Sequence, residues 1–326
     1  MDALLDLAPL SLRNHRLRRY LGDDLCSPLS SFEPVDQILI RKLYAFLQAL
    51  FEALKDGAET TRADRLQELL QQYDPEDVVT QARELGRASY AAAPSPQLAK
   101  TVHDLRGGGL TPLLGHLQLA QLGLSGAGLD TLYFLTRDHL KIMRNALLEL
   151  DDEKRNEDLL PKVHGTDFIV EKWNGAVLHH ERREIRLVVD CAQPAAISEC
   201  CVEFGALDRI LYNLINNACR HVANDSIRLV IFPVPDAGGE NLRFVLLNSV
   251  TEADAENLRA RDLPQLFEAG VSTTGSGFGL SVAADFVANA FGISDPAQAV
   301  AGRYLGATFV ESDFAVWFHW PIVADY

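Results

Sequence analysis

The hydrophobic pattern of this chain changes its period partway along, and that change limits the folds open to it. Up to the charged stretch DDEKRNED at 151–158, apolar residues recur at steps of three and four, the period of amphipathic helices. Beyond it, short runs rich in Val, Ile and Phe, typical of strands, are interleaved with helical segments. The chain therefore divides into an all-helical first part and a second part in which helices pack on a sheet, an α+β multidomain fold.

The first part contains a helical N-terminal region followed by a helical hairpin. Residues 34–55, 60–73 and 75–90 give the helical patterns of the N-terminal region. Residues 97–122 and 129–151 follow as two amphipathic helices joined by the turn-like GLSGAG, which predicts an antiparallel hairpin. Because one hairpin cannot cover both of its apolar faces, we expect two copies to pair as a four-helix bundle in a homodimer.

The second part alternates strands with helices, which predicts a two-layer α/β sandwich. The strand patterns cover 185–191, 226–234, 242–250 and a hairpin over 307–320, and the helical patterns cover 204–222 and 279–292. We place the domains at 1–92 for the helical N-terminal region, a candidate sensor or regulatory part, at 93–160 for the hairpin, and at 161–326 for the α/β domain.

Charge and cysteine content exclude several classes of function. The net charge is −15, and Lys and Arg form no stripe that could neutralise phosphates, so no nucleic-acid partner is expected. The five cysteines show no metal-ligand spacing. Neither a signal peptide nor a transmembrane helix is expected, because no apolar run is long enough. A reduced, cytoplasmic protein is the simplest interpretation.

Two segments of the second part carry residues suited to Mg²⁺ and phosphate groups. In NLINNACRH, Asn213 and Asn217 are four apart and share one helix face, and an amide oxygen is a suitable ligand for Mg²⁺. Arg220 and His221 follow one turn later, within reach of a polyphosphate. A solvated helix face with chance asparagines is the alternative interpretation.

The second of these segments is glycine-rich. In STTGSGFGL, the glycines at 275, 277 and 279 would let the backbone approach a phosphate, and the helix that begins there would direct its free N–H groups at the anion. A flexible loop before a core helix is the alternative.

In order and spacing these motifs resemble the catalytic domain of histidine kinases and related ATPases, the GHKL superfamily. NLINNA is similar to its N box, LFEAGVST at 266–273 to its F box, and GSGFGL to its second glycine box, and the resemblance covers roughly residues 165–321. It implies ATP as substrate and Mg²⁺ held by Asn217. The remaining nucleotide-binding residues that it implies are Asn213, Arg220, His221, Asn248, Thr273, Gly275, Gly277, Gly279 and Leu280.

The segment TVHDLRGGGLTPL at 101–113, in the first hairpin helix, resembles the H box of the same family. The resemblance implies that His103 is the phosphoacceptor. A neutral imidazole is a competent nucleophile, and an adjacent carboxylate such as Asp104 can orient it and take its proton. Arg106 would lie one turn further on, near the incoming phosphate.

Two departures from the family pattern stand out. The D-x-G-x-G box is replaced by LLNSVTEADAEN, so Asn248 stands where an Asp would accept the adenine amino group, and the glycines are missing. In the H box, Gly107 to Gly109 replace the usual polar-Pro pair, and such a run favours a bend in the helix. Gly107 also occupies a position linked to phosphatase activity, so we expect that activity to be weak.

The resemblance thus implies a cytoplasmic sensor histidine kinase of a two-component phosphorelay. It would autophosphorylate on His103 with MgATP and pass the phosphate to an aspartate of a separate response regulator. Two alternatives remain. One is a histidine phosphotransferase whose degenerate ATPase-like domain does not use ATP, as the missing D-x-G-x-G box suggests. The other is a non-catalytic pseudokinase scaffold, in which His103 could be replaced without loss of function.

Overall fold

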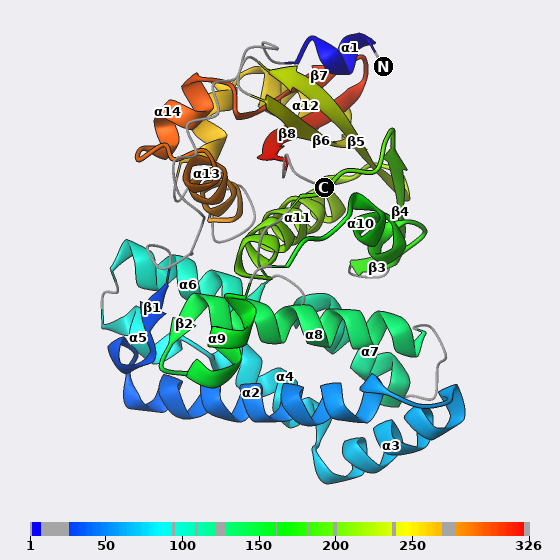
Figure 1. Cartoon of the computed structure of the whole chain (residues 1–326), viewed down its shortest axis with the longest axis vertical. Helices are drawn as coiled ribbons and strands as arrows, with labels where there is room; N and C mark the ends of the chain where they lie inside the picture. Colours follow the sequence, from blue (N-terminus) through cyan, green and yellow to red (C-terminus); the bar gives the residue numbers. More distant parts are fainter. Residues whose placement is uncertain are drawn as a thin grey trace. The chain divides into compact units, whose positions relative to one another are not determined.

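The structure is a computed structural model that describes residues 2–7, 26–92, 95–107, 110–121, 128–160, 162–180, 183–197, 201–236, 239–268 and 278–322. Their contacts divide the chain into two compact units (Figure 1). A helical unit lies within 22–159, and an α/β unit combines 1–21 with 160–326. The predicted fold class, a helical first part and a mixed α/β second part, is confirmed.

The helical unit is built from helices with one short pair of strands. The helices are α2 (Pro34–Lys55), α3 (Glu59–Gln72), α4 (Pro75–Glu84), α5 (Arg87–Ala91), α6 (Pro96–Arg106), α7 (Leu110–Gln121), α8 (Leu129–Ala146) and α9 (Asp152–Asp158), with the 3₁₀ turn η2 (Leu29–Ser31) before them. Strand β1 (Ser27–Pro28) pairs in parallel with β2 (Leu147–Leu148). The expected first hairpin helix is divided into α6 and α7 at its three glycines.

Helix α2 is the main packing partner of α8. Its apolar residues recur at helical spacing, and Ile40, Leu43, Leu47 and Leu54 are all at most 2% exposed. Burying each such side chain contributes about 1.5–3 kcal/mol of transfer free energy. Since α8 also packs against α6 and α7, part of the apolar surface of the hairpin is covered by α2 of the same chain.

The single helix expected over 75–90 is divided into α4 and α5 at Gly86. Gly86 has φ of 78°, in the left-handed region that favours glycine. Its N–H donates to Oδ1 of Asp36 at 2.8 Å, and the other carboxylate oxygen accepts from the N–H and the hydroxyl of Ser89 at 2.7 and 2.6 Å. Asp36 is 1% exposed, so this buried carboxylate fixes the turn between the two helices.

We expect Gly86→Ala to destabilise the helical unit by about 2–5 kcal/mol, because it combines left-handed backbone strain with overpacking. A Cβ at Gly86 would lie 2.4 Å from Cγ1 of Val102, the neighbour of His103 on α6. The measurement is the free energy of unfolding in urea. Gly115→Ala is the matched control, since nothing lies within 4 Å of a Cβ there and alanine favours the helix by up to about 1 kcal/mol. Equal stability of the two variants would contradict this account.

The α/β unit is built on one six-stranded sheet of order β3-β4-β5-β6-β8-β7. The strands are β3 (Val177–His180), β4 (Arg183–Cys191), β5 (Ser226–Asp236), β6 (Gly239–Ser249), β7 (Leu305–Val310) and β8 (Asp313–Pro321). Strands β4 and β5 are parallel, and every other neighbouring pair is antiparallel. The crossover between the parallel strands is α11 (Cys201–His221), as a parallel pair requires.

Helices pack on one face of this sheet (Figure 1). Besides α11, they include α10 (Thr166–Trp173) and α13 (Gly279–Ala290), while α12 (Glu252–Arg259), η3 (Leu263–Phe267) and α14 (Pro296–Ala301) complete the unit. A short helix from the start of the chain, α1 (Asp2–Leu5), packs with β5, β6 and β8 through Leu4 and Leu7. Residues 2–7 thus belong to the α/β unit, although their place in the sequence groups them with the helical N-terminal region.

Candidate functional site

Helix α6 holds His103 in its last turn. The helix begins after Ser95, whose side chain accepts from the N–H of Leu98 at 3.2 Å, and Pro96 occupies its first turn. It ends where the N–H of Gly107 donates to the carbonyl of His103 at 2.8 Å. The first of the three glycines thus ends the helix directly after its histidine turn.

His103 and Asp104 form a pair at the surface of the helical unit. Nδ1 of His103 lies 3.3 Å from Oδ1 of Asp104. The His103 side chain is 16% exposed and that of Asp104 only 2%. A buried carboxylate therefore lies beside a partly buried imidazole, an arrangement suited to orienting the ring and accepting its proton. Arg106 is exposed and donates to the backbone carbonyl of Arg83 at 2.9 Å, so in this structure its guanidinium is bound to backbone.

A second histidine lies close to this pair in the core. His139 on α8 is fully buried, and neither of its ring nitrogens has a hydrogen-bond partner of normal geometry. Burial lowers the pKa of His139 to about 4, although the Leu105 backbone and the carboxylates of Asp104 and Asp138 favour the charged form. His139 is thus neutral at pH 7. The Asp104 carboxylate both contacts the imidazole of His103 and favours the charged form of His139.

The depressed pKa of His139 predicts that acid destabilises the helical unit. The unfolded chain takes up this proton below pH 6.5 and the folded chain only near pH 4, so stability falls as pH drops through that window. By this linkage, His139 lowers the free energy of unfolding by about 2 kcal/mol between pH 7.5 and pH 5. Urea unfolding of the helical unit at both pH values, compared with His139→Leu, measures this. An unchanged pH dependence in the variant would rule the explanation out.

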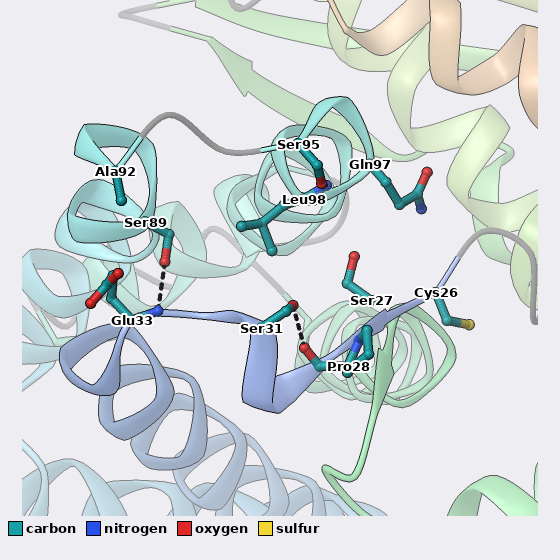
Figure 2. A pocket seen from close by; sticks show the side chains of 10 residues that line it. All are labelled: Cys26, Ser27, Pro28, Ser31, Glu33, Ser89, Ala92, Ser95, Gln97 and Leu98. Carbon is teal, nitrogen blue, oxygen red and sulfur yellow. Dashed lines mark hydrogen bonds between the residues drawn. The ribbon is translucent and has the colours of Figure 1, made fainter.

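Helix α6 also borders a hollow of about 430 Å³ within the helical unit (Figure 2). Its walls are Cys26, Ser27, Pro28, Ser31, Glu33, Ser89, Ala92, Ser95, Gln97 and Leu98. The N–H of Glu33 donates to the hydroxyl of Ser89 at 3.1 Å (Figure 2). The buried hydroxyls of Ser27 and Thr101 are hydrogen-bonded at 2.8 Å. Ser27, near the start of the helical unit, thus binds α6 at Thr101, two residues before His103.

Three of the nucleotide-site candidates, Asn213, Asn217 and Gly279, come together where α11 packs against the start of α13. Asn213 is 5% exposed and Asn217 is half-buried. A Cβ at Gly279, the first residue of α13, would lie 3.2 Å from Nδ2 of Asn217 and 3.8 Å from Cβ of Asn213. Both asparagines therefore face the N-terminus of α13, and the missing side chain at Gly279 leaves room beside the Asn217 amide.

The other candidates on α11 lie at its C-terminal end. Arg220 is exposed and His221 is half-buried. Burial lowers the pKa of His221, helped by the positive charges of Arg220 and His180, while Asp254 opposes them. His221 is therefore uncharged at neutral pH and would meet a ligand as a neutral imidazole.

Asn248 lies near the end of the central strand β6, between Ile227 of β5 and Phe314 of β8. It is 5% exposed, and its Nδ2 donates to the carbonyl of Ser249 at 3.2 Å. This bond orients Oδ1 as the acceptor side of the amide. The Asn248 side chain can therefore offer one amide oxygen as a hydrogen-bond acceptor.

Thr273, Gly275 and Gly277 lie outside the described residues. Leu280, the second residue of α13, is half-buried. Within the described residues, no group of three or more His, Cys, Asp or Glu side chains could hold a metal ion. A site on Asn217 would thus supply few protein ligands, as Mg²⁺ sites commonly do.

Sequence reasoning missed a buried ion pair that supports α11. Nζ of Lys172 lies 2.8 Å from Oδ1 of Asp208, and both side chains are 4% exposed. The same ammonium lies 4.6 Å from the ring centroid of Tyr212, one residue before Asn213. The two residues are far apart in the sequence, so no local pattern indicates the pair.

None of the described helices has the length and apolar character needed to cross a membrane. Comparisons with protein-family models and with curated protein sequences find no match.

Solved structures of histidine kinases do match. The catalytic domain of the histidine kinase ThkA, in a nucleotide-free form, is 15% identical over 48% of this chain and 86% of its own, with a TM-score of 0.29. Full-length ShkA in complex with AMPPNP is 17% identical over 78% of this chain, with a TM-score of 0.34, and the match spans 47% of its length.

A third match is the histidine kinase domain of a blue-light-activated histidine kinase from Erythrobacter litoralis. It is 14% identical over 68% of this chain and 91% of its own, with a TM-score of 0.30. All three of these matches are histidine kinases or domains of histidine kinases, and each is at most 17% identical to this chain.

Proposed function

We propose that this chain is an ATP-dependent protein histidine kinase that phosphorylates its own His103 and passes the phosphate to an aspartate of a separate response regulator. The order of the sequence motifs supports this proposal, and one structural observation carries it. The Asn-bearing face of α11 and the N-terminus of α13 meet at Gly279, where a Cβ would lie 3.2 Å from the Asn217 amide. An amide ligand and a helix N-terminus then share one site, which suits a metal-bound polyphosphate.

In this proposal the residues of α11 and α13 bind ATP. The half-buried Asn217 amide, beside the space at Gly279, fits a Mg²⁺ ligand. When bound, Mg²⁺ would offset the negative charge of the phosphates. The N–H groups at the start of α13 would face the phosphates, and Arg220 adds a cation at the exposed end of α11. Asn248 would accept from the adenine amino group.

His103 is the proposed nucleophile. Since Nδ1 of His103 lies 3.3 Å from Oδ1 of Asp104, we assign the attack on the γ-phosphorus of ATP to the other ring nitrogen, Nε2. A bond forms between that nitrogen and phosphorus while the bond from phosphorus to the β–γ bridging oxygen breaks, and ADP leaves. Asp104 accepts the Nδ1 proton as the ring gains positive charge. We propose that two copies associate through the hairpin helices.

A histidine phosphotransferase is the second candidate, and Asn248 is the observation that favours it. Where the related kinases carry an Asp, this residue offers an uncharged amide that also bonds the backbone of its neighbour. Such a protein would keep His103 but receive its phosphate from another protein.

Nucleotide binding separates these candidates. Calorimetric titration of the full chain with AMPPNP, with and without Mg²⁺, tests it without any turnover. The kinase requires saturable, Mg²⁺-dependent binding that is weakened at least about tenfold by Asn248→Leu, which cannot accept a hydrogen bond. The isosteric Asn248→Asp variant, which keeps an acceptor oxygen but loses the Nδ2 donor to the Ser249 carbonyl, should bind more tightly than Asn248→Leu. If folded protein binds no nucleotide at millimolar concentration, the phosphotransferase is favoured.

A further inference from the structure

The sheet of the α/β unit is apolar on both faces. Along β5, β6 and β8 nearly every residue is buried, rather than every second one. One set of alternating side chains faces the helices. The other set, which includes Val230, Phe232, Val245 and Trp317, forms a cluster with Leu4 and Leu7 from the start of the chain. Residues 2–7 thus pack on the face away from the helices, here called the outer face.

A buried arginine stands at the centre of the outer face. Arg243 is 0% exposed and is the cross-strand partner of His319. Its Nη1 donates to the carbonyls of Leu4 and Leu5, at 2.7 and 2.8 Å. These carbonyls end α1, where backbone acceptors lack partners within the helix and a positive charge is favoured. Arg243 therefore recognises the C-terminal end of a short helix, independently of its side chains.

His319 completes this recognition. Nε of Arg243 lies 2.9 Å from Nε2 of His319, and Nδ1 of His319 lies 2.9 Å from the carbonyl of Tyr304. A neutral imidazole that donates from Nδ1 and accepts at Nε2 satisfies both contacts. The hydrogen bonds from Tyr304 through His319 thus hold the Arg243 guanidinium in one orientation, and none of them involves residues 2–7.

We propose that the outer face is a binding site for the carbonyl end of a short apolar helix, and that residues 2–7 of this chain occupy it. These residues, here called the clasp, can detach from the face while the sheet stays folded. The segment adds no strand to the sheet. Within the described part of the chain, its anchors are the side chains of Leu4 and Leu7, the partly buried Leu5 and two backbone carbonyls. Few contacts have to break for it to leave, so it can open locally while the sheet remains folded.

The clasp changes how the two units are connected. The helical unit lies between residues 2–7 and residue 160 in the sequence, and both flanking segments belong to the α/β unit. With the clasp closed, the helical unit is attached at both of its ends. With the clasp open, it is attached at one end, and the apolar outer face becomes exposed together with an Arg243 Nη1 that no longer donates to the carbonyls of Leu4 and Leu5.

The test uses the full chain with a protease recognition sequence inserted between residues 15 and 16, cut only after folding. We expect the cut segment to stay bound through gel filtration. An excess of a fluorescent peptide of residues 1–8 should then replace it while the circular dichroism of the protein is unchanged. Leu4→Ser with Leu7→Ser in the peptide should weaken competition about 100-fold, roughly tenfold for each buried leucine. The control peptide, Asp6→Asn, alters an exposed residue and should compete like the original.

Two results would overturn the proposal, and both are read on cut protein that circular dichroism shows to be folded. If the cut segment leaves at once and amide exchange in β5 and β6 is unchanged, the outer face does not bind it. If the peptide replaces the segment only when the whole α/β unit unfolds, the segment is a fixed part of the fold and no clasp exists. Kinase activity enters neither readout.

Discussion

His103→Ala is expected to reduce autophosphorylation by at least ~10³-fold, because it removes the only nucleophile in the proposed reaction. The side chain lies in the last turn of α6 and is 16% exposed, so folding of the variant has to be checked beside its activity. The measurement is incorporation of label from γ-labelled ATP, with circular dichroism as the check on folding.

The control for this variant is His179→Ala, which removes an exposed histidine of the α/β unit. It should label like the original chain. His103→Ala should also bind AMPPNP with unchanged affinity, because His103 and Asn217 belong to different units. A chain that still accepts acid-labile label without His103 would show that the phosphoacceptor is another residue.

Asn217→Ala is expected to lower the rate of autophosphorylation by about 10²-fold and to remove most of the Mg²⁺ dependence of nucleotide binding. The reason is that the amide is the proposed protein ligand of the metal, and the electrostatic stabilisation of phosphoryl transfer depends on that metal. Burial of Asn217 is only partial, so the loss of stability should be small. Label incorporation over a Mg²⁺ titration measures both effects.

Asn216→Ala is the matched control, because it removes the same side chain from the same helix one residue earlier, about 100° around the axis. The expected outcome is a Mg²⁺ dependence like that of the original chain. Equal losses in the two variants would mean that the effect comes from α11 as a whole rather than from a metal ligand.

Periodicity predicted the main elements well because burial itself imposes the period. The apolar pattern of 34–55 corresponds to α2, and the strand patterns at 226–234 and 242–250 lie within β5 and β6 or end beside them. The break at Gly86 was not predictable in this way. An isolated glycine costs only about 1 kcal/mol in a helix, so glycine alone does not predict a break. The break depends on two residues distant in sequence: Val102, which packs close to Gly86, and Asp36, whose carboxylate accepts the Gly86 N–H.

The candidate site could be predicted only where local spacing carries the information. Asn213 and Asn217 share a helix face because they are four residues apart, and the structure places both beside Gly279. His139 could not be found in this way, since its relation to Asp104 arises from the packing of α6 against α8. The clasp depends on a contact between residues 239 positions apart. Its leucines could pack on many apolar surfaces, so the sequence does not indicate that they bind the outer face.

Mapping the phosphorylated residue tests most directly whether this chain phosphorylates its own His103 with ATP. Full chain is incubated with γ-labelled ATP and Mg²⁺, and the product is analysed for acid lability and mapped by mass spectrometry of its peptides. The account predicts an acid-labile, base-stable phosphate on the peptide that contains His103, formed only when Mg²⁺ is present. Folded protein that gains no label, or that carries an acid-stable phosphate on Ser or Thr, would contradict it.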